Sequence, residues 1–160
     1  MSIAVGQRIP EATLTIMSDA GPSPVSSTEL LGSGRVVLFA VPGAFTPTCS
    51  ADHLPSFLRQ AETLAERGVE RLVCTAVNDI FVLDAWARAN NAQDRITMAA
   101  DGNGDFARLL GLDFDGSAFG MGQRSQRYAM ILESGVIREL LVEEPGEFRV
   151  SSGDYVTERL

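Results

Sequence analysis

The sequence predicts an α/β sandwich built around one mixed β-sheet. Two short, continuous apolar runs, at 35–41 and 71–77, have the length and composition of strands buried on both faces. Each run is followed by a stretch with helical periodicity, and this alternation predicts parallel strands joined by helices. Further along, segments 127–132 and 136–142 flank Ser134-Gly135, which predicts a hairpin and therefore an antiparallel portion.

The first half of the chain supplies a possible hairpin, the first buried strand and a long helix. Segment 19–27 is rich in glycine, proline and serine, which indicates a hairpin or a surface loop. The strand at 35–41 leads into a loop that begins with Pro42-Gly43. Apolar residues then recur at helical spacing from 54 to 65, and Gly68 ends the pattern. Pro55 lies inside this helix and is expected to bend it.

The second half alternates again between helices and strands. Asn78-Asp79 predicts a turn and cap before a helix at 81–89, and a strand at 96–100 and a short helix at 105–110 follow. Ser151 and Ser152 can cap a final helix that runs towards Leu160. The resulting order, β-α-β-α-β-α-β-β-α, is that of a thioredoxin-like three-layer sandwich with a central mixed sheet, in one domain over 1–160. A fold by itself assigns no function.

Composition excludes several classes of function. The chain has 160 residues and a formal net charge of −8, so it repels phosphate backbones, and nucleic acid is not expected as a partner. Its longest apolar run is far shorter than the roughly 20 residues that a membrane span takes. The first ten residues lack the basic and apolar regions of a signal peptide. We therefore expect a cytoplasmic protein that does not bind membranes.

Two cysteines, Cys49 and Cys74, and one histidine, His53, are the residues with the most reactive side chains. A structural zinc site takes about four such ligands, so no metal site is expected. Cys49 stands in the first turn of the helix that follows the first buried strand, where free backbone N–H groups and the helix dipole stabilise an anion. A thiolate is the nucleophilic form of cysteine. The alternative is that Cys49 is a small, inert core residue.

The residues before Cys49 form the string PGAFTPTC, within which Pro42, Thr46 and Cys49 have the pattern P-x-x-x-T-x-x-C. With this string the sequence resembles the peroxiredoxins, and in particular their type II (Prx5) subfamily. The resemblance extends through HLPSF, AVNDIFVLDAW, ADGNGDFARLLGL and RSQRYAMIL, which begin at positions 53, 76, 100 and 124. Most of the chain is therefore covered.

The resemblance implies a role for four residues. Cys49 corresponds to the peroxidatic cysteine, which becomes a sulfenic acid. Thr46 corresponds to a hydroxyl that hydrogen-bonds the thiolate and the peroxide, and Pro42 to a proline that shields the sulfur from water. Arg127 corresponds to an arginine that stabilises the thiolate and the transition state, a role that suits a permanently charged guanidinium. Arg124, on the same segment, is the main rival to Arg127.

Other candidate residues leave alternatives open. His53 follows Cys49 by four residues; a Cys–His pair suggests a cysteine hydrolase, but no orienting Asp or Asn is evident, so we interpret His53 as a residue that supports the site. Cys74 lies in an apolar strand and is either a packed thiol or, as in some type II relatives, a resolving cysteine. Phe45, Phe119 and Met121 either line a peroxide entrance or a dimer contact, or pack in the core.

The leading hypothesis is a thiol peroxidase that reduces hydrogen peroxide and alkyl hydroperoxides. The resemblance implies recycling by an external thiol, either glutathione with glutaredoxin or thioredoxin, with no cofactor, and a homodimer. The alternatives are a redox-sensing or binding module of the same fold, and a monothiol disulfide exchanger. Peroxide chemistry needs both Thr46 and Arg127, whereas a scaffold needs neither. The hypothesis also requires that solvent reach the Cys49 sulfur and that a guanidinium contact it.

Overall fold

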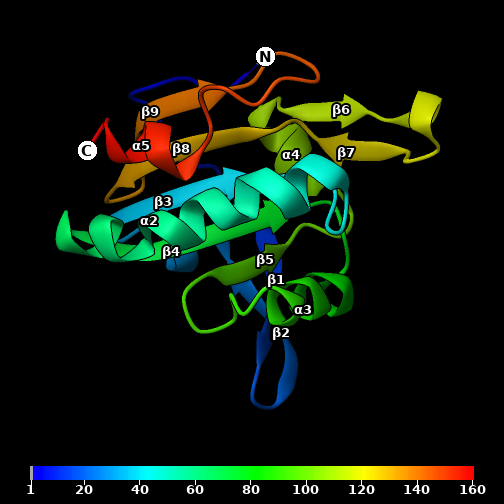
Figure 1. Cartoon of the computed structure of the whole chain (residues 1–160), viewed down its shortest axis with the longest axis horizontal. Helices are drawn as coiled ribbons and strands as arrows, with labels where there is room; N and C mark the ends of the chain where they lie inside the picture. The colour runs from blue at the N-terminus through cyan, green and yellow to red at the C-terminus, as the bar shows by residue number, and fades with distance from the viewer. Residues whose placement is uncertain (1) are drawn as a thin grey trace.

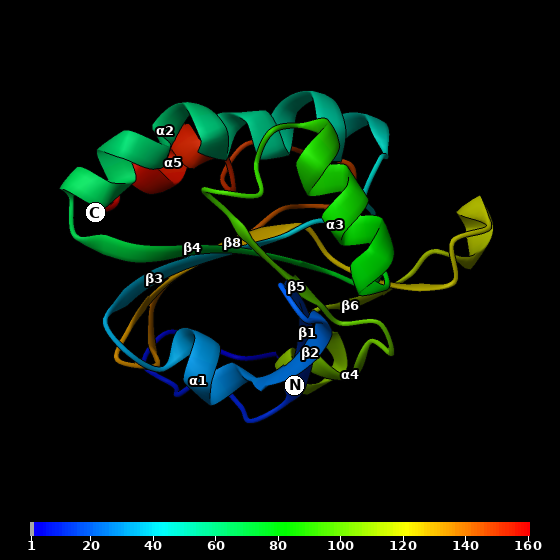
Figure 2. The same ribbon diagram turned by 90° about the horizontal axis from the view of Figure 1, so that it is seen from below.

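A mixed β-sheet with helices on both faces forms the body of the protein (Figures 1 and 2). The computed structural model describes residues 2–160. Within this range the sheet has seven strands, in the order β2-β1-β5-β4-β3-β8-β9. Their bounds are β1 (Thr13–Ser18), β2 (Gly21–Ser26), β3 (Arg35–Ala40), β4 (Val69–Ala76), β5 (Thr97–Ala100), β8 (Tyr128–Glu133) and β9 (Val136–Val142).

Helices cover the sheet in two layers, as the view in Figure 2 shows. The bounds are α1 (Ser27–Leu31), α2 (Leu54–Glu66), α3 (Ile80–Ala89), α4 (Asp105–Leu110) and α5 (Gly153–Thr157). Helices α2, α3 and α5 lie on one face, and α1 and α4 lie on the other. Each face has its own apolar core, and the core under α2 contains both cysteines. The predicted three-layer sandwich with a mixed sheet is therefore confirmed.

The interior strand β3 leads into the loop that carries Cys49 and so places the site. It pairs in parallel with β4 and antiparallel with β8, and β5 continues the parallel portion. The hairpin from β8 to β9 turns at Ser134 and Gly135, whose φ angles are both positive (50° and 80°), as the predicted tight turn requires. Strand β3 itself is buried from Val36 to Ala40, which explains its continuous apolar sequence.

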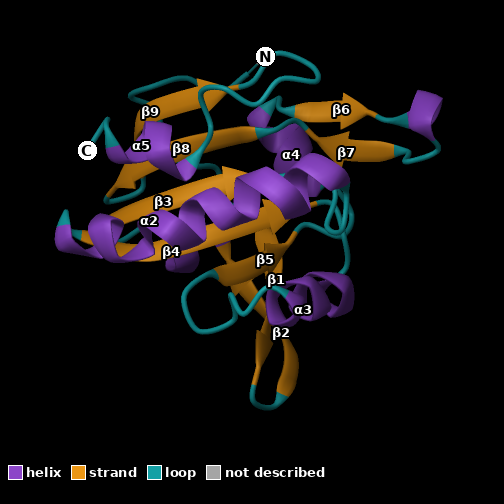
Figure 3. Ribbon diagram, in the orientation of Figure 1, coloured by secondary structure: helices purple, strands orange, loops and turns teal. Residues whose placement is uncertain are grey.

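Two hairpins add to the predicted strands, and only the second lacks a counterpart in the sequence analysis. In the first, β1 pairs with β2, which confirms the hairpin as the correct alternative for segment 19–27; the segment contains a tight turn, an edge strand and the start of α1. Pro22 and Pro24 are tolerated in β2 because an edge strand has one side without sheet partners. The second hairpin, β6 (Asp113–Asp115) with β7 (Gln123–Ser125), carries the 3-10 turn η2 (Ser117–Phe119) and projects from the body (Figure 3). These strands are short and partly exposed, so they lack the apolar runs that indicate buried strands.

Caps and one irregular turn define the helices around the site. Asp79 accepts a hydrogen bond from the Val82 N–H and begins α3, and Ser152 does the same with Tyr155 for α5, as predicted. Before α2 the chain forms a π-helical turn, η1 (Cys49–His53), in which the Leu54 N–H donates to the carbonyl of Cys49. Pro55 follows at once; its ring has no N–H and would crowd the carbonyl four residues earlier, and the wider π turn relieves this. The irregularity expected at Pro55 therefore takes the form of a π turn that begins at Cys49.

None of the helices in residues 2–160 combines the length and the apolar composition needed to cross a lipid bilayer.

Candidate active site

Cys49 lies where the loop after β3 turns into a helix. Ser50 donates its backbone N–H to the Thr46 carbonyl at 2.9 Å, so the first helical turn begins at Thr46 and contains Cys49. The loop is held by Asn78, whose side-chain oxygen accepts the Ala44 N–H at 2.9 Å, and the turn is held by Trp86, whose indole N–H donates to Ser50 Oγ at 3.0 Å. The expected position of Cys49 in a first helical turn is therefore confirmed.

Arg127 meets the sulfur from the neighbouring strand. Because Ala40 of β3 faces Tyr128 of β8, the residue before Tyr128 reaches the end of β3 at which the Cys49 loop begins. The Nη2 group of Arg127 donates to Cys49 Sγ at 3.1 Å. A charged donor at this distance can stabilise negative charge that develops on the sulfur during a reaction. The guanidinium that the hypothesis requires is therefore in contact with the sulfur.

Arg124 is held in a different place. Its Nε–H donates to the Met121 carbonyl at 2.9 Å, and its Nη1 lies close to Gly43. The structure thus brings Arg127, and not its rival, to Cys49 by a hydrogen bond.

Thr46 does not make the hydrogen bond to the sulfur that the resemblance implied. Its hydroxyl donates to the Gly43 carbonyl at 2.6 Å, across the turn that leads into the helix. A hydroxyl has one proton and two lone pairs, so a Thr46 hydroxyl that donates to Gly43 can only accept from a further partner. The correction follows from local turn geometry, which a sequence motif does not display.

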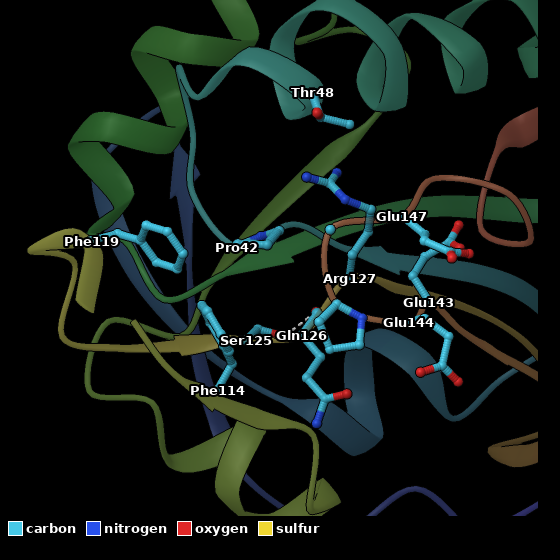
Figure 4. A pocket seen from close by; sticks show the side chains of 12 residues that line it. Pro42, Thr48, Phe114, Phe119, Ser125, Gln126, Arg127, Glu143, Glu144 and Glu147 are labelled. Carbon is cyan, nitrogen blue, oxygen red and sulfur yellow. Dashed lines mark hydrogen bonds between the residues drawn. The ribbon is translucent and has the colours of Figure 1, made fainter. Parts of the chain in front are cut away.

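The Cys49 sulfur is also less open than the hypothesis required. The side chain has 0% exposure and belongs to the core under α2. A cavity of about 580 Å³ is lined by Arg127 (Figure 4), and Arg127 is also the residue that contacts the sulfur. The requirement that solvent reach the Cys49 sulfur is therefore not met in this arrangement, whereas the required contact with a guanidinium is made.

The cavity has an apolar side and an acidic side. Phe114, Phe119 and Pro42 form the first, and Glu143, Glu144 and Glu147 lie on the other, beyond Arg127 (Figure 4). The remaining lining residues are Thr48, Ser125, Gln126, Arg127, Pro145 and Gly146. Pro42 thus lines the approach to the site, which agrees with a shielding position.

The apolar residues Phe45, Phe119 and Met121 differ in how far they are exposed. Phe119 lines the cavity and is 73% exposed, and Phe45 is 55% exposed, so neither packs in the core. Met121 is partly buried, and its methyl group lies close to Gly43.

His53 holds Arg127 in place. The ring is fully buried between Phe39, Phe57 and Phe148, with centroid distances of 5.0, 5.6 and 5.1 Å. Its Nδ1 lies 2.9 Å from Arg127 Nη1, and its Nε2 lies 2.9 Å from the Ser151 carbonyl. Since arginine only donates, Nδ1 accepts, and Nε2–H donates to Ser151. His53 therefore supports Arg127, and its ring is not hydrogen-bonded to the sulfur as the general base of a hydrolase would be.

The neutral state of His53 has a consequence for stability. Burial, and then the charge of Arg127, lower the pKa of His53 to about 3 from 6.5. The folded state therefore holds this ring neutral where an unfolded chain would protonate it, so its contribution to stability is full above pH 6.5 and is lost as the pH falls towards 3.

We predict that acid destabilises the wild type more than His53→Gln. Between about pH 6.5 and pH 5, the free energy of unfolding of the wild type should fall by about 2 kcal/mol more than that of the variant. Urea unfolding at a series of pH values measures this difference. Parallel pH dependences in the two proteins would contradict the neutral, buried assignment.

Cys74 lies in β4 and is fully buried, with a free thiol. Burial, and then the neighbouring Cys49, raise the pKa of the Cys74 thiol well above its usual value. A protonated thiol is a poor nucleophile, so in this arrangement Cys74 has the properties of a packed core residue. No group of three or more His, Cys, Asp or Glu side chains in residues 2–160 is placed to hold a metal ion.

Two residues of the site had no signal in the sequence. Glu143 follows β9 and lines the cavity, and Ser151, which we interpreted as a helix cap, accepts the hydrogen bond from His53. Only the cap at Ser152 forms as predicted. Both residues reach the site through contacts that are distant in sequence, and a single sequence does not display such contacts.

Comparisons with known proteins agree on one family. The family model described as Redoxin matches residues 4–156. Peroxiredoxin-2B of Arabidopsis thaliana is 40% identical over 159 residues, which cover 99% of this chain and 98% of the relative. A crystal structure of reduced Prx3 from Vibrio vulnificus in complex with H₂O₂ is 46% identical, covers 98% of each chain and superposes with a TM-score of 0.95. A 1-Cys peroxiredoxin of Plasmodium falciparum is 25% identical over 98% of each chain, with a TM-score of 0.91.

Proposed function

The chain belongs to the Redoxin family, as a type II peroxiredoxin, and from this premise we propose how its residues reduce a hydroperoxide. It is a thiol-dependent peroxidase. Among the alternatives, a binding module has no need of a cation on the sulfur, whereas a monothiol exchanger also attacks as a thiolate and is disfavoured by the family assignment instead. The observation that supports the proposed site is the hydrogen bond from Arg127 Nη2 to Cys49 Sγ at 3.1 Å.

The proposed reaction starts with the Cys49 thiolate. A lone pair of the sulfur attacks the terminal oxygen of ROOH, an S–O bond forms, the O–O bond breaks, and RO⁻ leaves to be protonated by water. The products are the Cys49 sulfenic acid and an alcohol, or water when R is hydrogen. Negative charge moves from sulfur to the leaving oxygen, and Arg127, which contacts the sulfur and also lines the cavity, can stabilise both.

The peroxide is positioned by groups with opposite hydrogen-bonding roles. Thr46 donates its only proton to Gly43, so its hydroxyl oxygen accepts a hydrogen bond from the peroxide O–H. Arg127 donates to the other end of the O–O bond. Because Cys49 has no exposed surface, the peroxide reaches the sulfur only when the Arg127 side of the cavity opens locally. In the Prx3 relative, H₂O₂ is bound to the reduced protein, which supports a site for hydrogen peroxide here.

We propose that an external thiol completes the cycle. A thiol RSH attacks the sulfenic acid with loss of water, and a second thiol releases Cys49 from the mixed disulfide. Glutathione with glutaredoxin, or thioredoxin, fits this step, because a buried Cys74 with a raised pKa is poorly suited to attack. A resolving role for Cys74 is the competing possibility.

The test compares the wild type with Cys74→Ser. Stopped-flow addition of hydrogen peroxide to either reduced protein should remove the Cys49 thiol far faster than free cysteine reacts, and mass spectrometry should find a sulfenic acid at Cys49. Turnover with glutathione and glutaredoxin should be largely retained in Cys74→Ser, with Cys74→Ala as a variant that buries no hydroxyl. Oxidation of Cys74→Ser without recycling would make Cys74 the resolving cysteine. A wild-type rate near that of free cysteine would reject the proposed site.

A homodimer and a cytoplasmic location complete the proposal. The exposed side chains of Phe45 and Phe119 provide apolar surface that a second copy could cover, and two free cysteines suit a reducing compartment. Light scattering of the purified protein tests the homodimer, and cell fractionation tests the cytoplasmic location.

A further inference from the structure

We propose that Glu143 is a positioning residue for the peroxidase reaction, which sets the Arg127 guanidinium against the Cys49 sulfur through Ser151 and His53. The inference rests on the function proposed above for Arg127 and Cys49. Nothing in the resemblance to known proteins or in the sequence assigned a role to Glu143.

Glu143 is a buried carboxylate whose charge is met by hydrogen bonds. Its side chain lies directly after β9 and the residue is only 7% exposed. One oxygen, Oε2, accepts the backbone N–H groups of Arg149, Val150 and Ser151 at 2.7, 2.9 and 2.9 Å, and the Ser151 hydroxyl at 2.7 Å. Successive backbone N–H groups that converge on one atom form a concave site for an anion. The carboxylate therefore organises the backbone from 149 to 151 around itself.

Ser151 connects the backbone segment that Glu143 holds to the ring of His53. Ser151 is fully buried, and both its N–H and its hydroxyl bond to Glu143. Its carbonyl accepts the Nε2–H of His53 at 2.9 Å, which fixes both the plane of the ring and its tautomer. The same segment is held to α2 two residues later, where the Gly153 N–H donates to Ser56 Oγ at 2.8 Å.

His53 and Glu143 then hold Arg127 at both ends. His53 Nδ1 accepts from Nη1 of Arg127, and the other terminal nitrogen, Nη2, donates to the sulfur. A guanidinium is rigid and planar, so fixing one of its terminal nitrogens also orients the other. At the opposite end of the residue, the Glu143 backbone N–H donates to the Arg127 carbonyl at 3.0 Å. Hydrogen bonds thus run in a closed ring from Glu143 through Ser151, His53 and Arg127 back to Glu143.

The direction in which the pH profile of Cys49 alkylation moves separates a positioning role of Glu143 from a purely electrostatic one. If Glu143 acted only through its negative charge, its removal would favour the nearby thiolate, and Cys49 would be alkylated at lower pH. If Glu143 orients Arg127, its loss weakens the contact between guanidinium and sulfur, and the alkylation profile moves to higher pH. Glu144 is exposed, is the next residue in the chain and lines the same cavity. Glu144→Gln therefore removes an equal charge without touching the ring of hydrogen bonds.

The experiment uses Glu143→Gln, which keeps the shape of the side chain and the backbone bond to Arg127. We expect the second-order rate constant of Cys49 oxidation by hydrogen peroxide to fall about 10- to 100-fold, the size of effect that a small misplacement of a catalytic group produces. We also expect the pH profile of Cys49 alkylation by iodoacetamide to move to higher pH in Glu143→Gln. In Glu144→Gln it should stay in place or move to lower pH.

A double-mutant cycle shows whether the effect passes through Arg127. In an Arg127→Ala background, Glu143→Gln should cause little further loss of rate, because the group that it positions is gone. Additive losses, an unchanged rate in Glu143→Gln, or an alkylation profile that moves to lower pH would each overturn the role of Glu143. If Cys49 in Arg127→Ala is oxidised at the wild-type rate, the proposed function of Arg127 fails. This single-variant measurement does not involve Glu143, so the two failures are distinguishable.

Loss of fold is controlled by a milder variant. Circular dichroism and thermal unfolding show whether Glu143→Gln remains folded. If it does not, Glu143→Asp carries the same test, since it keeps the charge but withdraws the carboxylate by about 1.5 Å, one carbon–carbon bond. A slower oxidation in Glu143→Asp supports positioning by geometry, and a wild-type rate overturns it.

Discussion

Cys49→Ser is expected to lose peroxide turnover completely. A serine hydroxyl is not ionised near neutral pH, and its oxygen cannot be converted to a sulfenic acid, so neither the attack nor the recycling step is available. Peroxide consumption in a coupled assay with glutathione and glutaredoxin should fall to the rate measured without protein. The surrounding hydrogen bonds need not change, because Arg127 Nη2 can donate to a hydroxyl oxygen as it does to the sulfur.

The control for this variant is Cys74→Ser, which alters the other buried thiol in the same core. We expect it to turn over peroxide while Cys49→Ser does not, with both proteins folded by circular dichroism. Residual turnover in Cys49→Ser, together with oxidation of Cys74, would show that the reactive sulfur had been assigned to the wrong residue.

Arg127→Ala should produce the second largest effect. The residue supplies the charged donor at 3.1 Å from the sulfur and also lines the cavity, so its loss removes stabilisation from both the thiolate and the leaving oxygen. Loss of one preorganised donor of this kind slows a reaction about 100- to 1,000-fold. Stopped-flow oxidation of the reduced variant by hydrogen peroxide measures this directly, with no contribution from the recycling step.

Two further variants make the Arg127 result specific. Arg124→Ala removes an arginine from the same segment whose Nε–H bonds to the Met121 carbonyl, and we expect it to keep most of the rate. Arg127→Lys keeps the charge but has one ammonium group in place of two terminal nitrogens, so it cannot bond His53 and Cys49 in the same fork. A partial loss of rate is therefore expected for the lysine variant. Equal rates for Arg127→Ala and wild type would move the role to Arg124.

Much of the fold could be predicted because its signals are local. The apolar runs of β3 and β4, the caps at Asp79 and Ser152, and the turn at Ser134-Gly135 all depend on residues within a few positions of one another. The strands β6 and β7 could not be predicted in this way, and β1 and β2 were indicated only as a possible hairpin. β6 and β7 are three residues long, and β2 lies at the sheet edge, so pairing with a partner, and not a continuous apolar sequence, maintains these strands.

The sequence by itself indicated the family, and it favoured Cys49 as the reactive cysteine and Arg127 over Arg124, because the strings PGAFTPTC and RSQRYAMIL carry those residues. Only the tertiary structure decided how they act together. It directed the Thr46 hydroxyl to the Gly43 carbonyl, buried the sulfur in contact with Arg127, and joined Glu143, Ser151 and His53 into the ring that holds the guanidinium. The reason is physical: the direction of a hydrogen bond and the burial of an atom depend on side chains up to about a hundred positions apart, as with His53 and Ser151, which are separated by 98 residues. Such contacts exist only after the chain has folded.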